Sequence, residues 1–181
     1  LGPLEDLMKS SDIPDKERKK ISLIHQSANR LFNLISQILE FRKTETQNRQ
    51  LCVERGNIVN TIYEIGLKYE ELNRKSTVDI SITAAEESIV IYYDKEVITI
   101  ILDNLISNAL KYTDSGNVHI SVARITEKNN KFVEIKVADS GYGISEEARP
   151  HIFDRYYQER SEHQASGTGI GLALVKNLVV L

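Results

Sequence analysis

An apolar residue recurs at spacings of three and four along residues 21–38, and this pattern constrains the fold more than any other feature of the chain. Such a heptad seam is typical of helices that pack along their length. Further apolar side chains widen the stripe toward that of a bundle, so the helix needs a partner helix, from upstream or from a second chain. The seam residues are Ile21, Ile24, Ala28, Leu31, Ile35 and Ile38, and those that widen it are Phe32, Leu34, Leu39 and Phe41.

The polar run from Lys43 to Arg49 divides the chain into two parts. Before it, the pattern predicts a helix over residues 15–43, with Asp15 as its N-cap and a short helical piece over 1–10. We therefore expect a helical hairpin with most of its first arm missing. After the polar run, helical and alternating segments follow one another in an α+β rhythm. They predict strands at 50–54, 78–82, 89–91, 118–122 and 132–138, a hairpin connection at 126–131, and helices at 58–72, 96–112 (capped by Asp94) and 170–181.

The composition is that of an ordinary soluble globular protein and excludes several classes. The 181 residues carry 23 Lys and Arg against 26 Asp and Glu, a formal net charge of −3 that gives no reason to expect nucleic acid. No apolar run approaches the roughly 18 residues of a membrane-spanning helix. The single cysteine, Cys52, excludes an internal disulfide framework and a cysteine-based zinc site, and it fits a reducing compartment.

Five of the nine glycines lie between residues 141 and 171. The run Gly167–Leu172 leads directly into a predicted helix, and backbone N–H groups at such a helix start favour a phosphate. A helix-entry turn with packing glycines is the alternative interpretation. The run lacks the Gly-Lys-Ser/Thr of a Walker loop, and the polar segment before it lacks the strand that a dinucleotide fingerprint requires.

A second glycine pair, Gly141 and Gly143, follows Asp139 at the end of a predicted strand. A carboxylate in this position can accept a hydrogen bond from an exocyclic amine such as adenine N6, where glycines let a ring approach. A turn of the Asp/Ser/Gly type is the alternative.

Three polar residues share one face of the helix predicted at 96–112. Asn104, Asn108 and Lys111 are spaced at i, i+4 and i+7. Amide oxygens suit a hard cation such as Mg²⁺, and the lysine suits phosphate oxygens. A solvated polar helix face is the alternative.

In this order, these elements resemble the ATP-binding core of a sensor histidine kinase of two-component systems, in the GHKL superfamily. Residues 103–113 resemble the N box, 139–143 the G1 box, 152–158 the F box and 166–174 the G2 box. The resemblance covers the chain from about residue 50 to its end. Upstream, residues 24–43 resemble the second helix of the family's dimerization and phosphotransfer hairpin. Their sequence is similar to that of hybrid two-component sensors.

The resemblance implies an α+β fold in two parts. Residues 1–46 would form a partial two-helix dimerization and histidine-phosphotransfer hairpin. Residues 47–181 would form the catalytic ATP-binding domain, a GHKL (Bergerat) α/β sandwich of helices packed on a mixed sheet. Residues 142–166 would be its ATP lid. Because the chain stops within an apolar helix, we expect the last strands of the sheet to be missing.

The resemblance also implies a site for ATP and Mg²⁺. Asn108 would coordinate the metal, Asn104 would support the same site, Lys111 would contact phosphate, Tyr112 would border the nucleotide and Asp139 would bind the adenine amino group. Further nucleotide contacts are implied for Gly141, Gly143, Ile144, Arg155, Gly167, Thr168, Gly169, Ile170, Gly171 and Leu172.

The residue at position 104 favours phosphotransfer over hydrolysis. Gyrase-like relatives have a Glu there that activates water, and an amide cannot act as a general base. The neighbouring Asp103 lies about 100° around the helix and should point elsewhere. The implied activity is transfer of the ATP γ-phosphate to a histidine, with relay to a response-regulator aspartate. A GHKL-type ATPase and a non-catalytic dimerization or signalling module are the alternatives.

None of the four histidines is followed by the family's acceptor motif, so no catalytic residue is assigned and the chain is expected not to phosphorylate itself. Implied partners are a second copy, through the hairpin, and a response-regulator receiver domain. No nucleic acid and no direct membrane contact are expected. The expected location is the cytoplasmic portion of a membrane-bound sensor. The four histidines are His25, His119, His151 and His163.

Overall fold

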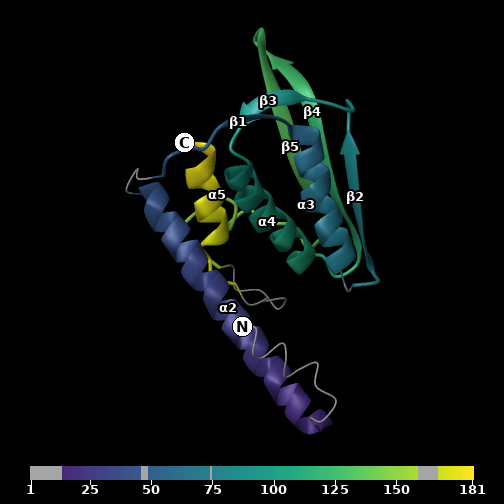
Figure 1. Ribbon diagram of the computed structural model, residues 1–181, viewed down its shortest axis with the longest axis vertical. Helices are drawn as coiled ribbons and strands as arrows, with labels where there is room; N and C mark the ends of the chain where they lie inside the picture. The colour runs from purple at the N-terminus through teal and green to yellow at the C-terminus, as the bar shows by residue number, and fades with distance from the viewer. Residues whose placement is uncertain (1–13, 46–48, 74, 159–166) are drawn as a thin grey trace.

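The structure, a computed structural model, describes residues 14–45, 49–73, 75–158 and 167–181. The predicted helical piece at 1–10, the boundary between 46 and 47, and His163 lie outside these ranges. Helix α2 (Asp15–Glu45) runs along one side of the molecule (Figure 1). Its predicted cap is wrong by one position: Asp15 is already helical, and the carbonyl of Pro14 accepts the N–H groups of Glu17 and Arg18.

The remaining elements form an α+β body. The predicted mixed sheet is confirmed as β2–β4–β5, and among the described strands β1 and β3 form a second, two-stranded sheet. In the larger sheet, β2 and β4 run parallel while β4 and β5 run antiparallel. The elements are β1 (Glu54–Asn57), α3 (Ile58–Leu72), β2 (Val78–Ala84), β3 (Val90–Tyr93), α4 (Lys95–Tyr112), β4 (Gly116–Glu127), β5 (Asn130–Asp139) and α5 (Gly171–Val179).

Several predicted boundaries shift by a few residues, and two of these changes have a visible cause. The strand expected at 50–54 begins only at Glu54, because the backbone N–H of Cys52 donates to the Asp94 carboxylate, 2.8 Å away, rather than to a strand. The connection expected at 126–131 shrinks to Lys128 and Asn129, since β4 and β5 continue to either side of it. Both turn residues have positive φ, 48° and 68°, the backbone of a two-residue hairpin turn.

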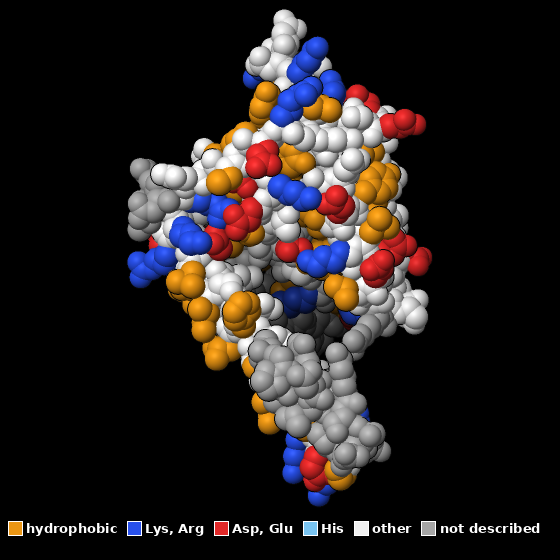
Figure 2. Space-filling model, in the orientation of Figure 1, with side chains coloured by type: hydrophobic (Ala, Val, Ile, Leu, Met, Phe, Trp, Pro, Cys, Tyr) orange, Lys and Arg blue, Asp and Glu red, His pale blue; other side chains and the backbone are white. Residues whose placement is uncertain are grey.

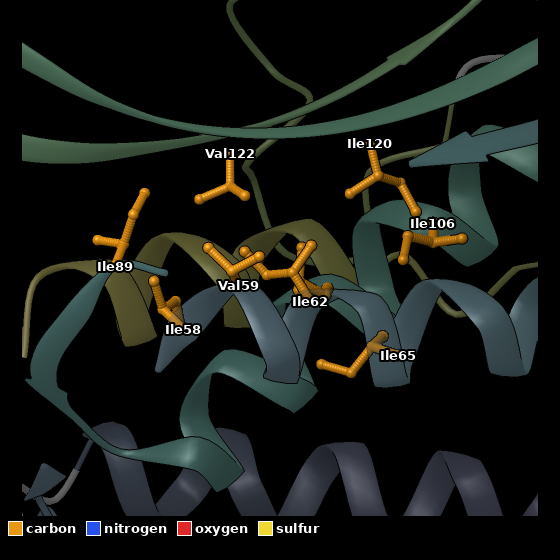
Figure 3. Packing of buried hydrophobic residues seen from close by; sticks show 9 residues of the cluster. Ile58, Val59, Ile62, Ile65, Ile89, Ile106, Ile120 and Val122 are labelled. Carbon is orange, nitrogen blue, oxygen red and sulfur yellow. The ribbon is translucent and has the colours of Figure 1, made fainter. Parts of the chain in front are cut away.

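The main apolar core lies between the larger sheet and helices α3 and α4 (Figure 3). Alternate residues of β4, namely Val118, Ile120 and Val122, are buried on the face toward these helices. Helix α3 approaches the sheet closely at Gly66, where a Cβ would lie 2.5 Å from Ile82 Cδ1. The core therefore fixes how α3 and α4 lie on the sheet.

Helix α4 is fastened at its start by Asp94. The carboxylate accepts the N–H of Val97 at 3.0 Å, which confirms the predicted N-cap. Burial of the Asp94 carboxyl favours a higher pKa. This is outweighed by hydrogen bonds from Val97 and Cys52 and by the positive charge of Arg49, which hold the pKa below its usual value.

Helix α4 is fastened at its end by a lysine from the loop before β2. The Lys75 ammonium donates to the carbonyls of Leu110, at 2.9 Å, and Thr113, at 2.8 Å. It also lies 3.6 Å from the carboxylate of Asp114. A cation at this end of a helix satisfies its last carbonyls and complements its dipole.

Helix α2 presents two different flanks. Phe41 is buried in an apolar cluster with Ile170 and Leu174 at the start of α5. The side chain of Asn177 in α5 donates to Thr44 at 3.4 Å. The seam predicted from the heptad pattern lies on the other flank, where hydrophobic side chains line the surface (Figure 2). Its exposed members include Ile24, Leu31, Ile35 and Ile38.

Replacing Asp94 with alanine should lower the free energy of unfolding by about 1–2 kcal/mol at neutral pH, because the first turn of α4 loses its cap. The folded-state pKa lies below the ordinary 3.8. The carboxylate's contribution is therefore present above that pH and lost as the pH falls through the folded value. Urea unfolding of wild type and Asp94→Ala should show a difference that shrinks below a pH of about 4. A difference independent of pH would contradict this account.

Replacing Lys75 with methionine should lower the free energy of unfolding by about 1–2 kcal/mol. The carbonyls of Leu110 and Thr113 at the end of α4 would lose a charged, partly exposed donor. Lys136→Met is the matched control, because Lys136 pairs only on the surface with Glu134, at 2.7 Å. That control should change stability by less than about 0.5 kcal/mol. Equal effects of the two variants in urea unfolding would show that Lys75 does not hold the helix end.

Candidate functional site

Two of the predicted glycine positions lie directly against α4. A Cβ at Gly171 would lie 2.6 Å from Asn104 Oδ1, and a Cβ at Gly167 would lie 2.7 Å from Lys111 Nζ. The backbone before α5 can approach these side chains because both positions lack a Cβ. The structure thus brings together four predicted site residues that are far apart in the sequence.

The three polar residues of α4 have different surroundings. Asn104 is buried, and its Nδ2 donates to the carbonyl of Ile100 at 2.7 Å. Asn108, one turn further, is half-buried. The Lys111 ammonium donates to the hydroxyl of Tyr112 at 2.9 Å and lies 4.5 Å from the centre of its ring. Asn104 therefore faces neighbouring helices, while Lys111 lies over the helix end beside Tyr112.

Asp103 points away from this group, as its angular offset from Asn104 predicts. Its carboxylate lies 3.3 Å from the ammonium of Lys68 in α3. The hydroxyl of Tyr69 in the same helix donates to the Asp103 backbone carbonyl at 3.3 Å. Burial, together with the nearby Asp103 charge, raises the pKa of that tyrosine. The carboxylate is committed to α3.

The turn after β5 packs on the end of α4. The carboxylate of Asp139 accepts the N–H of Gly141 at 3.0 Å. A Cβ at Gly141 would clash with the carbonyl of Tyr112, which accepts the N–H of Tyr142 at 3.3 Å. The next glycine, Gly143, has a φ of +74°, a conformation that favours glycine. The predicted adenine-binding segment therefore lies against the end of α4, the helix that carries Lys111.

Asp114, just beyond α4, fixes the same turn through a side chain. It accepts a hydrogen bond from the hydroxyl of Tyr142. This hydrogen bond raises the pKa of the tyrosine above its usual value. Since Lys75 lies near the same carboxylate, the loop before β2, the end of α4 and the turn after β5 form one network.

The described part of the predicted lid, residues 142–158, is joined to the segment that follows the lid. The N–H of Tyr156 donates to the carbonyl of Gly169 at 2.8 Å, and the Gln158 side chain donates to the carbonyl of Gly167 at 2.8 Å. Gly169 has a φ of +67°, and a Cβ there would lie 2.6 Å from Tyr156 Cα. These contacts fix the backbone that leads into α5.

Arg155, expected to contact the nucleotide, is engaged by α2 in this structure. Its guanidinium pairs with the carboxylate of Glu45 and lies 4.5 Å from the centre of the Phe41 ring. Ile144, expected near adenine, is exposed. A cavity of about 240 Å³ opens between α2 and this segment, lined by Ile38, Phe41, Arg42, Glu45, Arg155, Tyr156 and Ile170.

Gln37 in α2 also contacts the site, and no pattern in the sequence pointed to this contact. Its amide touches both Asn104 and Thr168, 67 and 131 residues further along the chain. A polar residue off the heptad seam is expected to be solvated, so only the packing of α2 reveals the contact. No sequence pattern pointed to Lys75 either, because its partners are backbone carbonyls at the end of a helix that is distant in the sequence.

Known proteins with similar sequences and folds are ATPases and histidine kinases. Residues 93–181 match the family described as histidine kinase-, DNA gyrase B- and HSP90-like ATPases. Over its whole length the chain is 33% identical to Histidine kinase P4 of Formosa agariphila, of which it spans 13%. Histidine kinase ThkA, solved in complex with response regulator protein TrrA, is 26% identical with a TM-score of 0.61, over 87% of this chain and 45% of that one.

A third comparison shows the fold alone. Full-length ShkA, solved in complex with AMPPNP, is 22% identical with a TM-score of 0.76, over 96% of this chain and 36% of that one. None of the helices in the described ranges is both long and apolar enough to cross a membrane. Residues 93–181 belong to the histidine kinase-, DNA gyrase B- and HSP90-like ATPases, and the chain contains an ATP-binding catalytic domain of the sensor histidine kinase type.

Proposed function

We propose that this domain directs the γ-phosphoryl group of ATP to a histidine side chain rather than to water. The observation that carries the proposal is the amide at Asn104. It occupies the helix position at which a hydrolase needs a carboxylate, and an amide cannot take a proton from water. The nearest carboxylate along the helix, Asp103, is engaged with Lys68 of α3. The domain's task is then to bind and orient the phosphates.

We assign the nucleotide contacts to the group around α4. Asn108 would hold Mg²⁺, Lys111 would bind phosphate oxygens, and the Asp139 carboxylate would accept the adenine amino group. The missing Cβ atoms at Gly167 and Gly171 leave the backbone before α5 against α4, which supports a phosphate cradle there. An amide oxygen suits Mg²⁺, which when bound neutralises phosphate charge. The other assigned contacts are Asn104, Tyr112, Gly141, Gly143, Ile144, Arg155, Thr168, Gly169, Ile170 and Leu172.

We further propose residues 1–46 as part of a dimerization and phosphotransfer hairpin and 47–181 as the catalytic domain, with its lid at 142–166. The exposed apolar flank of α2 supports pairing with a second copy. The complex of ThkA with TrrA supports a receiver domain as the partner that accepts the phosphoryl group. In the whole protein, this part would lie on the cytoplasmic side of the membrane.

We do not assign the phosphoacceptor role to any histidine of this stretch. His25 on α2 lies 3.2 Å from the side-chain amide of Asn29. His119 lies between the hydroxyls of Ser81 and Thr83 on the outer face of the sheet. His151 lies 2.8 Å from the carboxylate of Asp154. None of these contacts directs an imidazole toward α4.

Calorimetric titration with ATP tests the assignment of Asn108. Wild type should bind ATP more tightly with Mg²⁺ than without it, and Asn108→Ala should weaken the Mg²⁺-dependent binding by about tenfold or more, because a metal ligand is lost. The matched control is Asn33→Ala, an exposed asparagine of α2. Equal affinities for Asn108→Ala and wild type would remove Asn108 from the site.

The fate of the γ-phosphoryl group tests the reaction class. With γ-labelled ATP, the chain alone should neither release phosphate rapidly nor retain label, because Asn104 cannot act as a base and none of the histidines in the described ranges faces the site. In the whole protein, acid-labile label on a histidine is expected. Rapid release that is lost in Asn104→Ala would instead indicate a hydrolase. Stable label that is lost in His25→Ala would show that this chain phosphorylates itself.

A further inference from the structure

The side chain of Gln37 joins three elements of the proposed nucleotide site. Its Nε2 donates to Asn104 Oδ1 in α4 at 3.2 Å, and its Oε1 accepts the hydroxyl of Thr168 at 3.0 Å. Thr168 in turn accepts the N–H of Ile170 at 3.2 Å, immediately before α5. One amide of α2 is therefore bonded both to α4 and to the turn that opens α5.

The amide can satisfy both partners in only one orientation. Asn104 Nδ2 is committed to the Ile100 carbonyl, so only its Oδ1 faces Gln37, and this atom requires a donor. With Nε2 on Asn104, the Oε1 of Gln37 faces Thr168 and accepts the hydrogen of its hydroxyl, which also accepts the N–H of Ile170. The donor and acceptor ends of Gln37 thus match the groups that α4 and the turn present.

The backbone of α2 around Gln37 is held in place by packing. One turn further along, Phe41 is buried with Ile170, Ala173 and Leu174. The next turn brings Thr44 to Asn177 of α5. Gln37 therefore extends from a docked segment of α2, and its reach to Asn104 and Thr168 depends on where that segment lies. A shift of α2 along or about its axis would remove both hydrogen bonds together.

We propose that Gln37 is a positioning residue that couples the placement of α2 to the nucleotide site. It fixes the turn at 168–170 and hence the first N–H groups of α5, and it fixes the amide of Asn104 beneath Gly171. The inference rests on the proposed function, in which this turn and helix start form the phosphate cradle. Gln37 touches neither nucleotide nor metal in this account. Its effect passes through Thr168 and Asn104.

The test is ATP affinity in the presence of Mg²⁺ for wild type, Gln37→Met and the matched control Gln26→Met, an exposed glutamine of the same helix. Methionine keeps the length of the side chain but removes both hydrogen bonds. We expect Gln37→Met to weaken ATP binding about fivefold, the equivalent of one neutral hydrogen bond. Gln26→Met should leave the affinity unchanged.

A double-mutant cycle with Thr168→Val separates the bridge from general packing. If Gln37 acts through the Thr168 hydroxyl, Thr168→Val should cost much less affinity in the Gln37→Met background than in wild type. Additive losses would mean that Gln37 acts only by supporting α2, and this would overturn the proposal. So would an unchanged affinity of Gln37→Met beside a wild type that binds ATP.

A measurement without nucleotide separates failure of this inference from failure of the proposed function. Backbone amide chemical shifts of Ile170 and Gly171 should move in Gln37→Met and stay in place in Gln26→Met. If wild type binds no ATP, the proposed function fails, and these shifts still decide whether the bridge orders the turn. Unmoved shifts would overturn the bridge itself.

Discussion

Fixing both ends of α4 is the constraint on which the rest of the site depends. Asp94 holds the first turn and Lys75 the last carbonyls, while the apolar face between them packs in the core beneath β4. A helix secured in this way is a rigid base for side chains on its other faces. The turn after β5 and the backbone before α5 both pack on it. Their positions relative to each other are therefore set by this one helix.

Close backbone approach determines where polar groups gather. Gly167 and Gly171 bring main chain against Lys111 and Asn104, and Gly141 brings the turn after β5 onto the carbonyl of Tyr112. Side chains at these glycines would push the backbone before α5 and the turn after β5 away from α4. In the proposed function, the amide at position 104 favours phosphotransfer over hydrolysis, since it can hold and orient groups but cannot remove a proton from water.

Local patterns were sufficient for much of this architecture. The apolar spacing of α3 gave both its boundaries, the strict alternation in β4 gave its buried face, and the capping residue Asp94 was visible before any contact was known. Each of these features depends on residues within a turn or a strand of one another. The structure brings the motifs on α4 and around the glycines together, with Gly167 against Lys111 and Gly171 against Asn104.

The features that were missed depend on groups far apart in the sequence. β1 starts late because Asp94 captures the N–H of Cys52, and Arg155 lies on α2 because Glu45 and Phe41 are there. Gln37 contacts the site only because α2 docks on α5. No periodicity or local propensity encodes such pairings, because they arise only when separate elements meet.

The two flanks of α2 have a consequence for how this helix tolerates sequence change. Gln37, Phe41 and Thr44 contact α4 and α5, while Leu31 and Ile35 belong to the exposed apolar flank. Substitutions at these two sets of positions should affect different surfaces of α2. Homologues that have changed their pairing surface should therefore retain the residues facing α5. Among homologues, the residues at the two sets of positions should therefore change independently of each other, although they lie on one helix.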